Sequence, residues 1–545
     1  MIHEDERDAA REFFELFKTP WECYQASRRY GLVITTQDQM PAEGSAEAVA
    51  IYSSRAVAAD RDLGVSVRPG RKGAWVKWEQ DRFPVYGNLV ALESDGQPLA
   101  HLNETGETVA LEHARPGLKI MRMGFDLFRE AQFLFSEGQP AANAKAPTLE
   151  MHIAFLRALL LRAGTAFVEV PPIPAGYEFM SCLTHDVDFR GIRDHKLDWT
   201  MWGFVYRGVI GSLGRAAKRR MEWSKCWTNL KAVLSLPFVY SGLKPDFWLE
   251  FDRYAAMERG LGSTFYFVPF RNHAGAPSRR PAPKRRAVKY DLSAIAEEVR
   301  HLQENGCEVG VHGIDAWQDA EKALRERRRI DEITGQTETG VRMHWLYFDA
   351  GTPQALKQAG FAYDSTFGYN DAVGFRAGTS QVFRPRGPES VPELPLNIQD
   401  TAMFYPERMD LNEPEALGHC ERLIDSLQRF GGVLTINWHT RSLSPERLWD
   451  DFYGKLLNTL RQRAVWFATA NTIVKWFEQR RSVDFKCVQF GAREARVSLS
   501  GPVSHSLPAL MVRVYHPALQ SGGTGPAFVE QPWAGEEQLR ISIED

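Results

Sequence analysis

Residues 179–188 read Phe-Met-Ser-Cys-Leu-Thr-His-Asp-Val-Asp, and this stretch decides the fold class. Its first half, Phe179–Leu183, is a short apolar run of the kind that forms a buried strand. Asp186 and Asp188 then stand where that strand ends. Two carboxylates so close together need something that holds them, and a metal ion, or a division of roles between metal ligand and base, is the usual reason.

Three later stretches repeat the pattern of an apolar strand that ends in a polar side chain. They are Val309–His312, Val341–His344 and Val433–His439. In a barrel of parallel strands, the carboxyl ends of all strands meet on one face. The sequence therefore predicts one active site, assembled from several strand ends.

Apolar strands alternate with amphipathic helices between residues 177 and 481. The predicted strands are Phe179–Leu183, Thr264–Val268, Glu308–Val311, Val341–Met343, Phe361–Tyr363, Glu393–Leu396, Val433–Trp438 and Val465–Ala468. Leu292–Asn305, Glu321–Ile333 and Glu415–Arg429 are helical stretches between them. This alternation predicts a parallel, barrel-like α/β domain.

We predict three domains. Residues 1–175 mix short strands and helices and form an N-terminal α/β accessory domain, which ends near the prolines at 171, 172 and 174. Residues 176–482 form the barrel. Residues 483–545 carry short apolar or alternating runs separated by Gly and Pro, which predicts a small C-terminal β-sandwich.

Composition excludes several classes of function. The formal net charge of −3 over 545 residues argues against a nucleic-acid partner. The acidic first residues, Met1–Glu6, lack the apolar core of a secretory signal, and no run approaches the roughly 18 apolar residues of a transmembrane helix. Six cysteines stand singly, with no C-x-x-C pair, as is typical of a reducing compartment. We therefore expect a cytoplasmic protein.

Residues 190–246 form an insertion that mixes aromatic with basic side chains. They are Trp199, Trp202, Phe204, Trp223 and Trp227, with Arg215, Lys218, Arg219, Arg220 and Lys225. Residues 199–240 could make a peripheral contact with a membrane surface and bring a lipid-linked glycan to the site. They could equally form a helical hairpin that packs on the barrel, with Lys and Arg in solvent. We favour the packed hairpin.

The order and spacing of the motifs resemble the polysaccharide deacetylase superfamily (NodB homology, carbohydrate esterase family 4), in the branch whose first motif reads T-H-D-V-D. The resemblance covers residues 177–480 and implies a deformed (β/α) barrel of the NodB type. The motifs are Thr184–Asp188, Ser263–Phe267, Glu308–Gly313, Val341–His344, Tyr363–Tyr369, Gly374–Gly378, Glu393–Leu396 and Asn437–His439. The N-terminal segment, with Phe125–Phe135, also resembles the accessory domain of that branch.

The resemblance implies roles for the first two motifs. Asp186 is the base and Asp188 a metal ligand, and His312 is the first metal histidine. The family's second motif normally carries another histidine four residues later, but Ala316 stands there in this chain. Asp315 or His344 could supply the third ligand, and we favour His344 because it offers a ligand of the same type; His344 could also pack, or stack on a sugar.

Five further side chains complete the predicted site. By resemblance, Arg342 pairs with Asp186 and orients it, and His439 is the general acid that protonates the leaving amine. Asp400 could pair with His439 and raise its pKa. Trp438 and Tyr369 are candidate sugar-stacking surfaces, although core packing explains both equally well.

We therefore expect a cytoplasmic hydrolase, with one divalent metal ion, that removes N-acetyl groups from a carbohydrate in a polysaccharide or glycoconjugate pathway. Zinc is the expected metal, with cobalt or manganese as alternatives. Two other functions stay open. One is hydrolysis of a different C–N bond or of an ester, and the other is glycan binding without catalysis.

Overall fold

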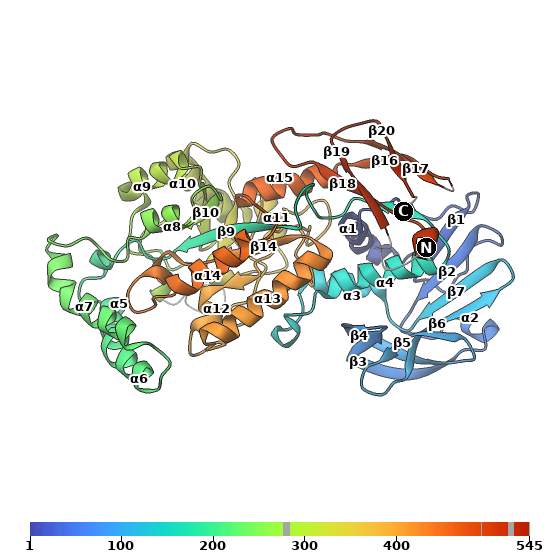
Figure 1. Ribbon diagram of the computed structural model, residues 1–545, viewed down its shortest axis with the longest axis horizontal. Coiled ribbons are helices and arrows are strands. Elements are labelled where there is room, and N and C mark those ends of the chain that lie inside the picture. The colour runs from blue at the N-terminus through green and yellow to red at the C-terminus, as the bar shows by residue number, and fades with distance from the viewer. Residues whose placement is uncertain (276–283, 492, 521–527, 544–545) are drawn as a thin grey trace.

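The computed structural model describes residues 1–275, 284–491, 493–520 and 528–543 (Figure 1). A parallel α/β unit lies at the centre, and the sheets of the N-terminal and C-terminal segments lie together at one end of it. A helical arm projects from the opposite end. Among the helices of the described residues, none has both the length and the hydropathy needed to cross a bilayer.

The central sheet runs in the order β12-β11-β10-β9-β14-β13, with β15 also paired to β9, and every pair in it is parallel. All nine residues of β9 are buried, as expected for a central strand of a parallel sheet. Six of the eight predicted strands are confirmed. The bounds are β9 Phe179–Val187, β10 Ser263–Phe267, β11 Glu308–Gly313, β12 Val341–Met343, β13 Ile398–Gln399, β14 Val433–Asn437 and β15 Val465–Phe467.

The other two predicted strands, Phe361–Tyr363 and Glu393–Leu396, are wrong. Only single bridges form nearby: Asp364 adjoins β12, and Glu393 adjoins Asp364. Pro395 interrupts the second segment, and proline cannot donate a ladder hydrogen bond.

These irregular residues still link the two edges of the sheet. Segment 393–399 starts beside Asp364, next to β12, and ends in β13, which pairs with β14. The parallel sheet is therefore a curled half-barrel whose edges are joined by irregular chain. This geometry brings the carboxyl ends of the strands to one face.

Helices cover the central sheet, and their ends follow local sequence signals. Asn412 and Glu415 form a capping box at the start of α13, and Gly335 ends α10 in a left-handed conformation. The bounds are α8 Phe251–Met257, α9 Ala296–Glu304, α10 Ala320–Thr334, α11 Thr352–Gln358, α12 Asp400–Phe404, α13 Glu413–Phe430, α14 Asp450–Arg461 and α15 Ala470–Arg481.

The N-terminal segment folds around a mixed sheet of order β1-β2-β7-β6-β5-β3-β4. Helices α1, α3 and α4 share a core with this sheet. The bounds are α1 Arg7–Phe17, β1 Tyr30–Thr35, β2 Ala46–Tyr52, α2 Ala58–Asp62, β3 Ser66–Trp78, β4 Asp81–Glu93, β5 Gln97–Leu102, β6 Thr108–Arg115, β7 Leu118–Met123, α3 Leu127–Ser136 and α4 Thr148–Arg162.

The C-terminal segment contains strands in two three-stranded sheets, β16-β17-β20 and β19-β18-β8. The segment is β-rich, as predicted, but one sheet takes its third strand, β8 (Phe167–Glu169), from the end of the N-terminal segment. The remaining bounds are β16 Asp484–Phe490, β17 Glu494–Ser500, β18 Leu510–Tyr515, β19 Phe528–Trp533 and β20 Gln538–Ser542.

Candidate metal centre and active site

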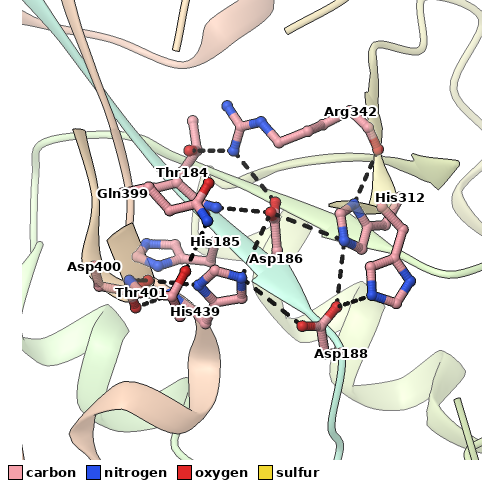
Figure 2. A network of polar contacts seen from close by, with 12 residues as sticks. Thr184, His185, Asp186, Asp188, His312, Arg342, Gln399, Asp400, Thr401 and His439 are labelled. Atoms are coloured by element: carbon pink, nitrogen blue, oxygen red, sulfur yellow. Dashed lines mark hydrogen bonds and ion pairs between the residues drawn. The ribbon is translucent and has the colours of Figure 1, made fainter. Parts of the chain in front are cut away.

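The predicted catalytic and metal-binding residues meet at the carboxyl ends of the central strands (Figure 2). Asp186 lies at the end of β9, and Asp188 follows it. His312 lies in β11, Arg342 in β12, and His439 is the second residue after the strand β14. Neighbouring strands pair in register here, so that the side chains can converge.

Asp188, His312 and His344 form a cluster that could hold a metal ion, because their ligand atoms all lie within 4.8 Å of one another. Asp188 Oδ1 lies 3.3 Å from His312 Nε2 and 3.5 Å from His344 Nε2. Two imidazole nitrogens and one carboxylate oxygen form a donor set that suits zinc and leaves room for a water or substrate oxygen.

Hydrogen bonding sets the tautomer of His312. Its Nδ1 lies 2.9 Å from the carbonyl oxygen of Arg342, and a carbonyl can only accept, so Nδ1 carries a proton. In the neutral ring, Nε2 therefore points a lone pair toward the carboxylate of Asp188. A lone pair that faces a carboxylate is favourable only with a cation between them, which is the arrangement of metal-binding histidines.

His344 fits the same cluster. Burial lowers the pKa of His344 to about 3, so its imidazole is neutral and available as a ligand. Burial raises the pKa of Asp188, but the cationic neighbours of the carboxylate, His439 among them, outweigh burial and hold that pKa well below its usual range. Asp188 Oδ1 is also buried without a hydrogen bond. The residues present therefore fit a divalent cation.

Asp315, the other candidate for third ligand, lies outside this cluster. Its Oδ2 pairs with His273 Nε2 at 2.7 Å, and its backbone N–H donates to buried Glu326. Asp315 thus stabilises the loop after β11. Of the two candidates, His344 is the one that the structure places beside Asp188 and His312.

Asp186 is held by two donors. Arg342 Nη1 lies 3.2 Å from Oδ1, and Asn437 Nδ2 donates to Oδ2 at 2.7 Å. Burial raises the pKa of Asp186, but positive charge beside the carboxylate, with Arg342 among its sources, outweighs burial, and the net pKa is lowered. The carboxylate is therefore ionised and fixed in orientation.

His439 is oriented by Asp400, which lies at the start of α12. Nδ1 of His439 lies 2.6 Å from Asp400 Oδ1, and the backbone N–H of His439 donates to Oδ2 at 2.7 Å. Burial by itself lowers the pKa of His439, but the carboxylates of Asp400, Asp188 and Asp186 outweigh burial and raise it. The predicted Asp400–His439 pair therefore exists, and it favours the form of the imidazole that carries a proton on Nε2.

Asp186 and His439 face each other across a gap. Nε2 of His439 lies 3.9 Å from Asp186 Oδ2 and 3.8 Å from Asp188 Oδ2, distances longer than a hydrogen bond. A carboxylate that can accept a proton and an imidazolium that can donate one thus flank the same space (Figure 2).

The predicted sugar-stacking surfaces lie elsewhere. Trp438 is 0% exposed, with its ring stacked on Phe452 and Tyr453, so its position contradicts a sugar-stacking role. Side chains alternate along a strand, and Trp438 points away from the face used by its neighbours Asn437 and His439. Tyr369 is half-buried and donates to the carbonyl of Gln139; its sugar-stacking role stays a prediction.

The sequence pointed to Thr184 as a residue that supports the site, but it gave no indication of Ser365 and no role for Asn437. Thr184 Oγ1 accepts from Arg342 Nη1 at 2.6 Å, and Ser365 receives two further guanidinium hydrogen bonds. Asn437 was quoted within a motif but given no role. Its position two residues before His439 was the available signal, because a period of two places both on one face.

A separate cavity of about 740 Å³ lies in the N-terminal segment and is lined by Phe14, Trp21, Tyr30 and residues around them. None of the predicted site residues lines this cavity. The chemistry described above therefore belongs to the strand ends and not to this cavity.

No protein-family model and no curated protein sequence matches the chain. Several solved structures are similar to it, among them the following three. A Mycobacterium smegmatis protein named as a polysaccharide deacetylase is 17% identical over 57% of this chain and 95% of its own, with a TM-score of 0.35. A Pseudomonas aeruginosa PAO1 protein, also named as a polysaccharide deacetylase, is 17% identical over 45% of this chain and 77% of its own, with a TM-score of 0.32. An allantoinase is 15% identical over 56% of this chain and 92% of its own, with a TM-score of 0.33. Because these TM-scores are below 0.5, we base the proposed function on the geometry of the site.

Proposed function

We propose that this protein is a metal-dependent hydrolase that removes N-acetyl groups from a sugar in a polysaccharide or glycoconjugate pathway. The supporting observation is the gap between Asp186 and His439 beside the cluster of Asp188, His312 and His344. Amide hydrolysis needs a water activated by a base, stabilisation of the oxyanion and a proton for the leaving amine. The site offers a group for each need.

A divalent ion held by Asp188, His312 and His344, zinc or else cobalt or manganese, would supply a water acidic enough to react near neutral pH and would polarise the amide carbonyl. Asp186 accepts the proton of the attacking water, while Arg342 and Asn437 keep its carboxylate ionised and oriented. His439 Nε2 donates a proton to the departing amine. Asp400 keeps that imidazole protonated and fixes its ring.

The cytoplasmic location belongs to the same proposal. All six cysteines are free thiols, and three of them, Cys182, Cys226 and Cys420, are buried. Free thiols in such number are typical of a reducing compartment. The N-acetylated substrate is then a carbohydrate precursor or oligosaccharide that is reached from the cytoplasm.

Metal content tests the ligand set. Elemental analysis of purified protein should find roughly one divalent ion per chain, as expected of a three-ligand catalytic site. His344→Ala should lose the ion. Asp315→Ala, which also removes a buried ionisable side chain near the site, is the control and should keep it. Wild-type protein that stays metal-free after incubation with zinc, cobalt or manganese would remove the basis of the hydrolase proposal.

Substrate profiling tests which bond the protein hydrolyses. Wild-type protein should release acetate from N-acetylated oligosaccharides, and Asp186→Asn should bind the same metal and release none above background. Faster turnover of an O-acetyl ester or a cyclic amide would mean that the same active site hydrolyses a different bond from the one proposed. Metal-loaded wild type that binds the oligosaccharide without turning over any of these substrates would favour glycan binding without catalysis.

A further inference from the structure

Residues 192–248, here called the helical arm, project from the central unit (Figure 1). The arm contains α5 (Trp199–Tyr206), a π-helical turn (Arg207–Gly211), α6 (Ser212–Ala217) and α7 (Trp223–Tyr240). It has a small core of its own, which includes Phe204, Leu236 and Trp248. The arm is thus a folded hairpin.

The base of the arm is fixed beside the candidate site. Glu446, in the loop that follows His439, forms ion pairs with Arg441 and with Arg207 of the arm. The guanidinium of Arg441 lies 3.8 Å from the ring centre of Trp248. The arm therefore leaves the fold between the two segments that carry Asp188 and His439.

The arm carries most of the exposed large apolar side chains. Of sixteen on the described residues, eleven belong to the arm. They are Leu197, Trp199, Trp202, Tyr206, Ile210, Leu213, Trp223, Trp227, Leu234, Phe238 and Leu243. Monomeric proteins rarely expose so many large apolar groups in one region without a binding function.

On α7 these side chains form a stripe. Trp223, Trp227, Leu234 and Phe238 are spaced by four, seven and four residues, which places them on one side of a helix of 3.6 residues per turn. The opposite side, with Cys226, Leu236 and Val239 among others, is buried in the arm. The helix therefore has one apolar face that the fold covers and one that it leaves uncovered. The hairpin does contact the barrel, as the favoured expectation has it, but Arg207 and Lys225 make ion pairs in that contact and this apolar face stays uncovered.

The arm carries an excess of positive charge, although Arg207, Arg220 and Lys225 form ion pairs with Glu446, Asp410 and Glu413 of the central unit. Residues 192–248 contain ten Lys and Arg but four Asp and Glu, a net charge of +6, and since the whole chain carries −3, the remainder carries −9. Lys218, Arg219 and Arg220 are exposed in the turn between α6 and α7. Lys231 Nζ lies 5.7 Å from the ring centre of Trp227, so charge and aromatic surface are adjacent.

We propose that the helical arm docks on an anionic lipid bilayer, with its tryptophans at the interface and its lysines and arginines against the headgroups. Trp, Leu and Phe beside Lys and Arg are the composition of helices that lie in a membrane interface. Anionic headgroups complement a net charge of +6 on the arm. A second copy fits less well, because a two-fold dimer through this surface would bring two arms of the same sign together.

Docking has a geometric consequence for the site. Because the arm starts four residues after Asp188 and its base contacts the loop after His439, a docked arm holds the candidate site near the bilayer surface. The proposal does not depend on the chemistry of that site. It rests only on the exposed side chains and the charge of the arm.

Vesicle flotation of the full chain tests the proposal, on vesicles of phosphatidylcholine with phosphatidylglycerol and on vesicles of phosphatidylcholine alone. The double variant Trp199→Glu with Trp223→Glu removes two exposed tryptophans without destabilising the arm. Each tryptophan is the first residue of its helix, where a carboxylate stabilises the helix. Trp199 is 92% exposed, so no core packing is lost. Trp21→Glu, at an exposed tryptophan of the N-terminal segment, is the matched control.

We expect wild type and Trp21→Glu to float with the anionic vesicles, and the double variant to bind them about tenfold more weakly or worse. Binding to phosphatidylcholine alone should be weaker for all three. Equal flotation of the double variant, or no flotation of wild type, would overturn the proposal. A second result would also overturn it: sedimentation that shows a dimer of wild type without vesicles and a monomer of the double variant. The stripe would then bind a second copy of the chain.

Discussion

At the residue scale, the charge of His439 depends on Asp400. Burial favours the neutral imidazole, and the carboxylate of Asp400 reverses that preference, so the folded pKa of His439 is raised. The protonated form, which the proposed acid step needs, therefore persists to higher pH than for a free histidine. Asp400→Asn removes the charge and keeps the shape.

We expect Asp400→Asn to move the alkaline limb of the pH profile of kcat/KM to lower pH. Activity on the alkaline side should fall by about tenfold or more, because less of the acid is protonated there. Asp95→Asn, at an exposed aspartate of the N-terminal segment, is the control and should leave the limb in place. An alkaline limb that Asp400→Asn does not move would mean that another group is the acid.

Asn437 is a positioning residue for Asp186. It donates to Oδ2 at 2.7 Å, and a hydrogen bond to a charged group is worth about 1.5–3 kcal/mol. Asn437→Ala should therefore lower kcat by about tenfold to a hundredfold, with a smaller effect on KM and with the metal retained. Kinetics and elemental analysis on the same preparation check this. Loss of metal together with kcat would instead indicate a general collapse of the site.

Much of the site could be predicted from the sequence, because strand-terminal Asp and His residues are visible as motifs. Asp188, His312 and His344 meet as expected, and so do His439 and Asp400. The contacts of Thr184 and Ser365 with Arg342 could not be predicted, because they depend on which strands become neighbours. For Trp438 the sequence left sugar stacking and core packing equally open, and alternation along β14 turns the ring inward, which decides for core packing.

At the element scale, six central strands were predictable because each is a short apolar run bounded by turn residues. The segments 361–363 and 393–396 have similar composition but make only single bridges around Asp364. Buried side chains satisfy the backbone there instead: Glu393 Oε1 accepts from the N–H of Phe367, at 2.8 Å. Hydrogen bonds from side chains that replace those between strands leave no periodic signal in the sequence.

Helices α13 and α7 have equal length but differ in how much of their apolar surface is covered. Leu423 of α13 is 1% exposed in the main core, whereas Leu234 of α7 is 72% exposed. Leu423→Ala should lower the free energy of unfolding by about 2–5 kcal/mol, because it leaves a cavity. Leu234→Ala should change it by less than about 0.5 kcal/mol. Urea unfolding of both variants checks the difference, and an equal loss would contradict the exposure of the α7 stripe.

At the scale of the whole molecule, distant segments are tied together by contacts that no local pattern reveals. Strand β8 pairs with β18, more than three hundred residues later. Arg480 of α15 donates to the carbonyls of Val170 and Leu16, each at 2.8 Å, and Arg481 pairs with Glu12. The three predicted domains therefore share interfaces, and their boundaries remain predictions.

The metal cluster also joins separate parts of the chain, since Asp188 follows β9, His312 lies in β11 and His344 follows β12. A ligand that binds only the folded state stabilises it, by about 2.7 kcal/mol at a hundred times Kd. Zinc should therefore raise the Tm of chelator-treated wild type and leave that of His312→Ala nearly unchanged. Calorimetry with and without zinc checks this. An equal rise in both proteins would place the stabilising ion elsewhere.

Charge is divided unevenly over the molecule, and this division decides how it can approach a membrane. The arm carries +6 and the remainder −9, so an anionic surface attracts the first and repels the second, which orients the chain arm-first. Salt screens both forces, and binding to anionic vesicles should weaken steadily as sodium chloride is raised, while the tryptophan contribution persists. Lys218→Glu with Arg219→Glu should weaken binding at low salt by about tenfold or more and flatten the salt dependence. A salt dependence that this variant leaves unchanged would mean that charges outside the arm make the contact.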